Sequence, residues 1–311
     1  ALDIDGDGYD DLVTNWAGSN SSICLWSGSA FADWSTIGPN VCWSASSISY
    51  AFSGDLNGDG YDDLYMPDTS AAVAYVIFGG QAPSTSVATV AEAADLSFSI
   101  AGSDGNFNGE GGYAHIADLD DDGFDDMVLG TNTHTSDVLG MGWLLFGRDR
   151  KSWESLDGLN LFDNADVTFE SDALGMGKPC AIVGDLDGDG IAEIAFGAGN
   201  ETDGSTRRSA VVLYQGQDVV DAAAKTGSLT SVEAIELWLD QGYTGGSEGS
   251  MWMVMPVGDM DGDGLAELMA TAPNGDFVSN DYGGAVLIYG DEVPFTSGTV
   301  DSVATVFAAS S

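Results

Sequence analysis

Short apolar runs bounded by Gly, Asn and Asp recur along the whole chain. Runs of this kind that are rich in Val, Ile and aromatic residues are typical of β-strands. They come in a fixed order: a run before an acidic loop, a run after it, a run ending in an aromatic residue and Gly, and a run of alternating character. One copy reads "YAHIAD" (113–118), "MVLGT" (127–131), "WLLFGR" (143–148) and "DVTFESD" (166–172). Each copy therefore predicts four strands, and only single helical turns, such as one within 219–225, are expected besides them.

The acidic loop between the first two runs occurs five times, at 3–11, 55–63, 118–126, 185–193 and 259–267. Five copies of a four-stranded module predict an all-β fold, a β-propeller in which each module is one antiparallel blade. The expected blades of this single propeller domain are 1–47, 48–102, 103–173, 174–242 and 243–311. The first blade lacks most of its innermost strand, since only Ala1 and Leu2 precede its loop. Three explanations stay open: a five-bladed ring lacking one strand, part of a larger propeller, or a blade completed by another chain.

The residue types within the nine-residue loop point to a metal site. Positions 1, 3 and 5 are Asp or Asn in every copy, position 6 is Gly, and position 9 is Asp or Glu. Carboxylates alternating around a tight turn suit Ca²⁺, which takes six to eight oxygen ligands, better than Mg²⁺, which demands stricter octahedral geometry. An EF-hand is excluded because position 12 never carries a chelating residue.

About five calcium sites are therefore expected, one per blade. Their side-chain ligands are Asp3, Asp5, Asp7, Asp11, Asp55, Asn57, Asp59, Asp63, Asp118, Asp120, Asp122, Asp126, Asp185, Asp187, Asp189, Glu193, Asp259, Asp261, Asp263 and Glu267. The position-7 backbone carbonyls add Tyr9, Tyr61, Phe124, Ile191 and Leu265.

The aromatic-Gly strand end, the D-x-D-x-D-G-x-x-D loop and the small residues after it resemble the FG-GAP repeat. "FGG" (78–80), "FGR" (146–148), "GAG" (197–199) and "TAP" (271–273) stand for the tripeptides that give the repeat its name. The resemblance implies a calcium-binding propeller like that of integrin alpha subunits and bacterial surface proteins, with calcium on the hairpins between first and second strands. Integrin propellers have seven blades, whereas five are visible here.

Composition narrows the function further. Acidic residues outnumber basic ones 50 to 7, and the formal net charge is −43, which excludes nucleic acid and anionic membranes as partners. No apolar run is long enough to span a bilayer. Cys24 and Cys42 lie in adjacent apolar runs, where a disulfide between neighbouring strands can form, and Cys180 is expected to be a buried thiol. Weak calcium sites are filled outside the cell, so a secreted or cell-surface protein is expected.

The face opposite the calcium loops is the ligand face of the resembled family. Aromatic and basic residues of its long loops form a candidate contact patch for a protein or glycan: Phe107, His134, Arg207, Arg208, Tyr243 and Trp252. The predicted function is adhesion by a binding module. The alternatives are a structural subunit of a calcium-dependent surface polymer, self-assembling through the first blade, and a propeller-type glycosidase or lyase.

An enzyme is not predicted. "GGSEG" (245–249) matches the nucleophile-elbow pattern but lies in a loop, whereas that motif needs a strand before it and a helix after it. The only acids outside the calcium loops that fit a carboxylate pair are Asp104, Glu110 and Glu248.

Overall fold

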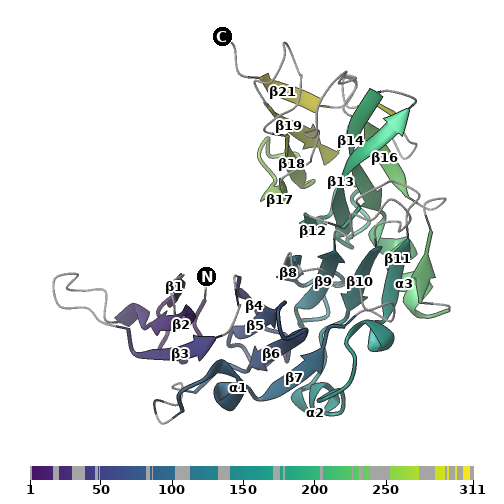
Figure 1. Ribbon diagram of the computed structural model, residues 1–311. Coiled ribbons are helices and arrows are strands. Elements are labelled where there is room, and N and C mark those ends of the chain that lie inside the picture. Colours follow the sequence, from purple (N-terminus) through teal and green to yellow (C-terminus); the bar gives the residue numbers. More distant parts are fainter. Residues whose placement is uncertain are drawn as a thin grey trace. The chain divides into compact units, whose positions relative to one another are not determined.

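The computed structural model describes residues 2–16, 21–29, 39–45, 48, 50–81, 85, 87–101, 113–131, 141–170, 176–177, 179–203, 206–225, 227–230, 234–238, 253–272, 284–290, 293, 298–299 and 304–308. The chain forms two compact units (Figure 1). The first contains residues 1–112, 123–127 and 146–164, and the second contains residues 113–122, 128–145 and 165–311.

The modules at 1–47 and 48–102 each form one antiparallel sheet. The first sheet contains three strands in the order β1 (Leu12–Trp16), β2 (Ser21–Trp26) and β3 (Val41–Ala45). The second contains β4 (Phe52–Gly54), β5 (Asp63–Asp68), β6 (Val73–Ile77) and β7 (Leu96–Ser99). Among the described residues, the first sheet has no strand at the position that β4 takes in the second.

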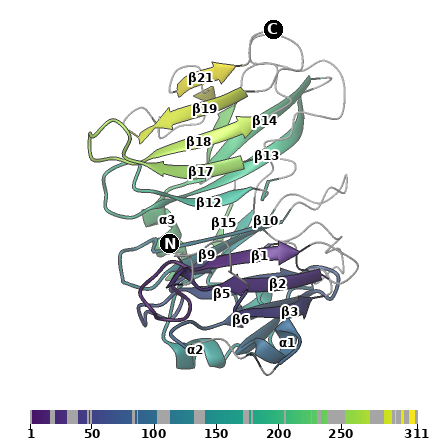
Figure 2. The same cartoon turned by 90° about the vertical axis from the view of Figure 1, so that its left-hand side faces the viewer.

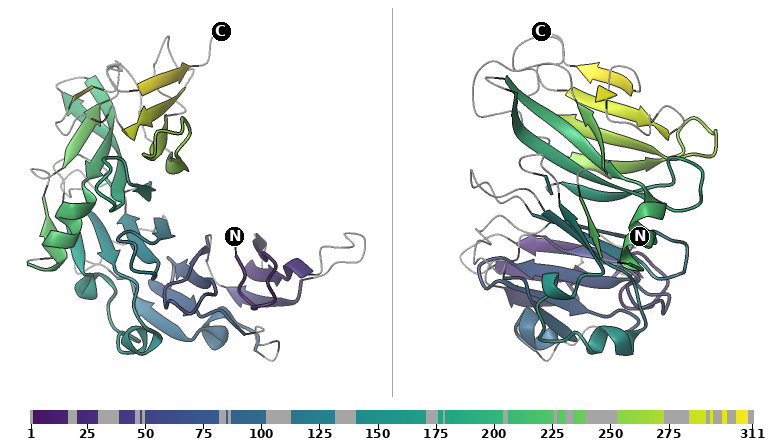
Figure 3. Two further views of the ribbon diagram at one scale, coloured as in Figure 1. Left: turned by 180° about the vertical axis from the view of Figure 1, so that it is seen from behind. Right: turned by 90° about the vertical axis from the view of Figure 1, so that its right-hand side faces the viewer.

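The third module forms a sheet of β8 (Tyr113–Ala117), β9 (Asp126–Thr131), β10 (Met141–Leu145) and β11 (Val167–Glu170). The fourth contains β12 (Cys180–Gly184), β13 (Glu193–Asp203), β14 (Thr206–Tyr214) and β16 (Ile235–Trp238). The fifth contains β17 (Met253–Gly258), β18 (Glu267–Ala272), β19 (Gly284–Tyr289) and β21 (Ala304–Ala308), side by side in Figure 2. Its yellow strands can also be followed in the right-hand view of Figure 3.

The prediction of an all-β chain with one antiparallel sheet per module is therefore confirmed. None of these sheets closes on itself within the described part of the chain. The named helices are short: α1 (Val90–Ala93), α2 (Arg150–Glu154), a 3-10 turn (Phe162–Asn164) and α3 (Gly216–Ala223). The described residues contain no helix with the length and apolar character needed to span a membrane.

Two local expectations are corrected by the structure. The polar segment around Arg207 and Arg208, expected as one of the long loops, mostly continues β13 and β14 as a long hairpin, in which Glu201 pairs with Arg208 and Asp203 with Thr206. The helical turn expected within 219–225 begins earlier, at Gly216, and extends over eight residues as α3. Its Val219 and Ala222 are buried, so this helix is held by packing of its apolar face.

Straps connect each module to the outermost strand of the module before it. We use this name for the segments 87–89, 158–161, 227–229 and 298–299, which lie between the third and fourth strands of their modules. The Ser44, Ser99 and Thr168 N–H groups donate to strap carbonyls at 2.7–2.9 Å. The later straps contain β15 (Ser228–Leu229) and β20 (Gly298–Thr299), which pair in parallel with β11 and β16.

Each unit has its own apolar core. In the first, Trp43, Leu25 and Ile48 pack with residues of β5 and with Val90 of α1. In the second, side chains of β12, β13, β14, β16, β18 and β19 form one buried cluster. A disulfide joins Cys24 to Cys42, which lie directly opposite each other on β2 and β3, and Cys180 is a buried free thiol.

Candidate metal centres

The first Asp of each acidic loop organises the loop backbone. In the first copy, Asp3 Oδ1 accepts the Gly6 N–H at 2.9 Å and Oδ2 accepts the Gly8 N–H at 2.9 Å. The bond from the position-6 glycine recurs in the second, fourth and fifth loops at 2.7–3.0 Å. Ser, Thr, Asn and Asp side chains favour such local bonds in turns, so this Asp shapes the loop before any ion is considered.

Two positions in each loop adopt the left-handed backbone conformation. Position 6 is Gly in every copy, with φ between 85° and 97°. Position 4 also has a positive φ, and there one copy carries Asp121 at φ 58° in place of Gly. Because Asp tolerates this conformation better than most residues, the third loop keeps the same turn.

The position-9 carboxylates are buried in all five loops, unlike most of the others. The set is Asp11, Asp63, Asp126, Glu193 and Glu267. Glu193 shows their role: its Oε2 accepts the Leu186 N–H of its own loop at 2.6 Å, and its Oε1 accepts the Gly216 N–H at 3.3 Å. The equivalent glycines after the third strands of the first three modules donate to position 9 at 2.8–2.9 Å. Position 9 therefore joins the acidic loop to the aromatic-Gly strand end.

This connection explains why Gly follows the aromatic residue. A Cβ on Gly79 would lie 2.3 Å from the Asp62 carbonyl oxygen, at position 8 of the loop. A Cβ on Gly28 would lie 2.1 Å from the Asp10 oxygen, and one on Gly216 would lie 2.5 Å from the Ala192 oxygen. These are backbone contacts that cannot relax by a rotamer change, so only Gly allows the strand end to approach the loop.

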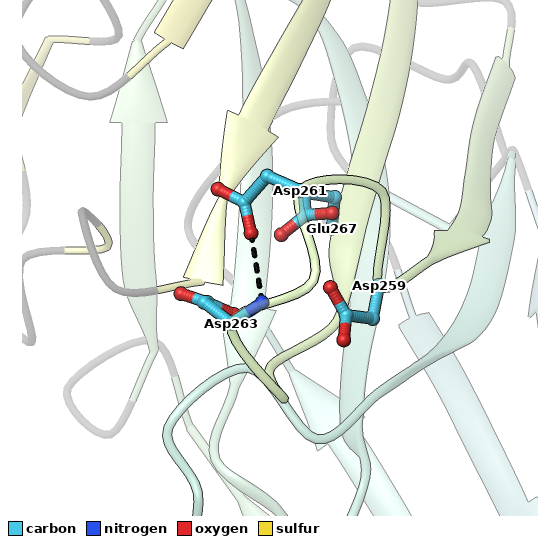
Figure 4. Close-up of side chains that lie close together, drawn as sticks. All are labelled: Asp259, Asp261, Asp263 and Glu267. Atoms are coloured by element: carbon cyan, nitrogen blue, oxygen red, sulfur yellow. Dashed lines mark hydrogen bonds between the residues drawn. The ribbon is translucent and has the colours of Figure 1, made fainter.

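Four of the loops gather carboxylate oxygens into groups that could hold a metal ion. The groups, with ligand atoms within 4.8 Å of one another, are Asp3, Asp5 and Asp11; Asp118, Asp120 and Asp122; Asp185, Asp187 and Glu193; and Asp259, Asp261, Asp263 and Glu267. Figure 4 shows the last group, with side chains on both arms of the loop and the Asp263 N–H donating to Asp261 at 3.1 Å.

The second loop differs from the others. Its position 3 is Asn57, whose Nδ2 donates to both oxygens of the buried Asp63 at 3.1 Å. With the amide bound to the carboxylate, Asp55, Asp59 and Asp63 do not form a group like the other four among the described residues. The structure thus brings some of the expected ligands together in four loops. In the second loop, whose residues are all described, it does not gather three carboxylates within the same distance.

Comparisons with known proteins identify the repeats. The family model described as FG-GAP-like repeat matches residues 3–66, and the model described as FG-GAP repeat matches residues 181–214 and 251–289. The chain carries FG-GAP repeats. A comparison with curated proteins gives no match.

One oxygen in the third acidic loop lacks a partner. Asp120 Oδ1, at position 3, is buried and accepts no hydrogen bond, the only such side-chain atom among the described residues. Burial, together with the nearby charges of Asp122 and Asp118, raises the pKa of Asp120. A buried carboxylate oxygen without a donor costs free energy unless a cation or water compensates it, and a hard cation is the partner that three clustered carboxylates suit.

The buried position-9 carboxylates of the FG-GAP repeats have perturbed protonation. Burial raises the pKa of Asp63 and of Glu193 to about 8, against the hydrogen bonds that lower it. Both groups therefore hold a proton near neutral pH when no cation is bound. A divalent ion in the same loop would favour the charged form, so its binding would release protons.

The other predicted site residues cannot be placed. Phe107, His134, Tyr243 and Trp252 lie outside the described residues, and so do the enzyme candidates Asp104, Glu110 and Glu248. Arg207 and Arg208 lie on β14, in the hairpin with β13, but their side chains are outside what the structure describes. The position-7 residues are in place on the loops: the Tyr9, Tyr61, Ile191 and Leu265 N–H groups each donate to the position-5 carboxylate of their own loop.

Proposed function

We propose that the acidic loops of this FG-GAP repeat protein bind Ca²⁺ and that the bound ions stabilise a propeller. The observation that carries the proposal is the buried, partnerless Asp120 Oδ1 within the group of Asp118, Asp120 and Asp122. In the first, fourth and fifth loops, the residues that would hold the ion are the carboxylates at positions 1, 3 and 9, joined by position 5 in the fifth. The ion would supply positive charge that offsets the mutual repulsion of these carboxylates, several kcal/mol per neighbouring pair at an effective dielectric constant near 20.

Thermal unfolding tests this proposal. At free calcium ten to one hundred times the Kd, each filled site adds roughly 1.4–2.7 kcal/mol to the free energy of unfolding. We expect a large rise in Tm in millimolar CaCl₂ over EDTA, and a smaller rise in MgCl₂ at the same concentration. Isothermal titration calorimetry in two buffers of different ionisation enthalpy should also detect proton release. An identical melting curve in calcium and in EDTA would overturn the structural role of calcium.

Variants locate the sites. Asp120→Ala removes the partnerless oxygen and should lose one calcium equivalent in the titration. Asn57→Ala alters the second loop, which among the described residues forms no carboxylate group of the kind found in the other four loops. It should leave the number of bound ions nearly unchanged. A matched loss of calcium in both variants would argue that the binding is diffuse and not localised in the loops.

We further propose that the protein acts outside the cell as a binding module for a protein or glycan, in adhesion. Three observations support this: the FG-GAP repeats, the Cys24–Cys42 disulfide, which is typical of oxidising compartments, and the acidic composition, which disfavours nucleic acid. The proposed contact residues are the aromatic and basic side chains on the side of the modules opposite the acidic loops. The proposed module is not an enzyme.

A glycan array and an adhesion assay on intact cells test the binding proposal. The variant Arg207→Glu/Arg208→Glu should lose binding because it reverses two of the few positive charges on the chain. Lys225→Glu is the matched control. Lys225 is an exposed basic residue that pairs with Asp221, and both lie outside the hairpin that carries Arg207 and Arg208. Binding that is equal in both variants, or absent from wild type in calcium, would contradict the proposed surface.

A further inference from the structure

The residue before the glycine that contacts the acidic loop differs among the modules. In every module, one glycine after the third strand lies so close to the position-8 carbonyl of its loop that a Cβ would stand 2.1–2.7 Å from that oxygen: Gly28, Gly79, Gly147, Gly216 and Gly290. The residue before it is aromatic in three modules, namely Phe78, Phe146 and Tyr289. It is Ser27 in the first module and Gln215 in the fourth. Two modules therefore carry a polar side chain at the position where the other three carry an aromatic one.

Gln215 contacts a carboxylate of the fourth loop. Its Nε2 donates a hydrogen bond to Oδ2 of Asp187, at position 3, over 3.2 Å. Gln215 is also the N-cap residue of α3, yet its side chain makes no capping bond to the described residues of that helix. The amide therefore serves the acidic loop and not the helix that follows it. Ser27 makes a corresponding contact in the first module, where its Oγ donates to Oδ2 of Asp7, at position 5, over 3.0 Å.

Two adjacent residues after β14 hold two of the three carboxylates that the fourth loop gathers. The group is Asp185, Asp187 and Glu193. The Gly216 N–H donates to Glu193, and the Gln215 amide donates to Asp187. The other oxygen of Asp187 accepts the Asp189 N–H at 3.0 Å. Asp187 thus has a donor on each of its oxygens, and the donor on Oδ2 is a side chain that can be replaced without changing the loop.

A donor on each oxygen restricts how a carboxylate can turn. A side chain that samples several rotamers must be fixed in one of them when a ligand binds, and this ordering costs free energy. A carboxylate that is already fixed avoids that cost, so the ion binds more tightly. Carboxylates that ligate metals are commonly hydrogen-bonded in this way, and the loss of such a partner typically costs about 10–100-fold in metal affinity. The bond from Gln215 to Asp187 is therefore expected to strengthen ion binding in the fourth loop.

We propose that Gln215 is a positioning residue, which holds Asp187 in the orientation that the ion of the fourth loop requires. This inference rests on the proposed calcium binding and names a residue outside the loop that strengthens it. Phenylalanine has no hydrogen-bond donor in its side chain, so the second and third modules lack this contact. The fourth loop should lose calcium affinity when Gln215 loses its amide, and the fifth loop, where Tyr289 stands at this position, should not.

Gln215→Met tests the proposal, because methionine is unbranched like glutamine but carries no N–H donor. The control is Gln217→Met on the same helix, since the Gln217 amide donates at 3.2 Å to Asp221, outside the acidic loops. A CaCl₂ titration followed by amide-resolved NMR measures the loops separately. The Gly190 N–H reports on the fourth loop and the Gly264 N–H on the fifth, since each donates at 3.0 Å to the position-1 carboxylate of its own loop.

The same samples in EDTA show whether the amide fixes the carboxylate before any ion binds. Three-bond couplings should report one χ1 rotamer for Asp187 in wild type and in Gln217→Met, and an average over rotamers in Gln215→Met. Couplings that are equal in all three proteins would overturn the positioning role.

In the titration of Gln215→Met, the Gly190 midpoint should move to about tenfold higher free calcium while the Gly264 midpoint keeps its wild-type value. Gln217→Met should change neither midpoint. A Gly190 midpoint that stays with the control overturns the proposal, and so does an equal shift of both midpoints, because the effect is then not confined to the fourth loop. Failure of the proposed calcium binding gives a different result: neither glycine responds to calcium in wild type, and the inference falls with it.

Discussion

Replacing Glu193 tests whether the buried position-9 carboxylate holds the loop to the strand end. Glu193→Ala removes the acceptor of two backbone N–H groups, of Leu186 at 2.6 Å and Gly216 at 3.3 Å, both in buried surroundings. Each buried donor left without a partner costs about 1–3 kcal/mol, so the free energy of unfolding should fall by about 2–6 kcal/mol. At about 2–4 °C per kcal/mol, Tm should drop by roughly 4–24 °C.

Glu193→Gln separates the hydrogen bonds from the charge. Because burial raises the pKa of Glu193 to about 8, this side chain is mostly neutral at pH 7 without metal, and a neutral amide of the same shape replaces it closely. In EDTA, the glutamine variant should therefore lose only about 1 kcal/mol, for the one acceptor that its amide nitrogen cannot supply.

Differential scanning calorimetry in EDTA measures both variants, which makes the result independent of metal. Glu154→Gln is the control, since this side chain is 53% exposed and its change should stay within about 0.5 kcal/mol. The expected order of Tm is wild type and control, then the glutamine variant, then the alanine variant. An alanine variant that melts with the control would refute the clamping role of position 9.

Three further predictions concern pH and the loop backbone. In EDTA, the raised folded-state pKa of Asp63 and Glu193 makes their contribution to stability greatest below the unfolded-state pKa near 4 and lost as pH rises through about 8. The free energy of unfolding should therefore fall between about pH 5 and pH 8, by up to about 1.4 kcal/mol per pH unit and group, and Tm should fall with it; a Tm that rises over this range would contradict the assignment. Gly79→Ala places a Cβ 2.3 Å from the Asp62 carbonyl oxygen and should cost at least about 1–3 kcal/mol in chemical denaturation, whereas an unchanged midpoint would mean that the strand end can move away. Asp121→Val puts a β-branched residue at φ 58° on an exposed loop and should cost about 1–2 kcal/mol while Asp121→Gly is tolerated; equal midpoints for both variants would show that this backbone conformation is not required.

The sequence predicts the features that repeat at a fixed spacing. The apolar runs indicate the strands of each module, and the loop register indicates which carboxylates lie together, because both depend on residues close in the chain.

Features that depend on distant partners are not predicted. Position 9 looks like another ligand in the sequence, and only the fold reveals that Glu193 is buried against Gly216, which follows it by 23 residues. In the sequence, Asn57 is interpreted as a ligand equivalent to Asp. In the structure its Nδ2 instead donates a hydrogen bond to Asp63. The long β13–β14 hairpin is missed because its polar residues are typical of loops, and pairing across the hairpin overrides that preference.

The straps have a consequence for how an array of repeated modules avoids aggregation through its strand edges. An outermost strand is a row of unpaired backbone groups, ready to recruit a strand from another molecule. Here each new module brings the cover for the outer edge of the one before it, as 227–229 does for β11 and 298–299 for β16. Lengthening the array by whole modules therefore adds no open outer edge, and among the described strands only β21 lacks this protection. Removing a module instead uncovers the outermost strand of the module before it, so a truncation between modules creates a new open edge.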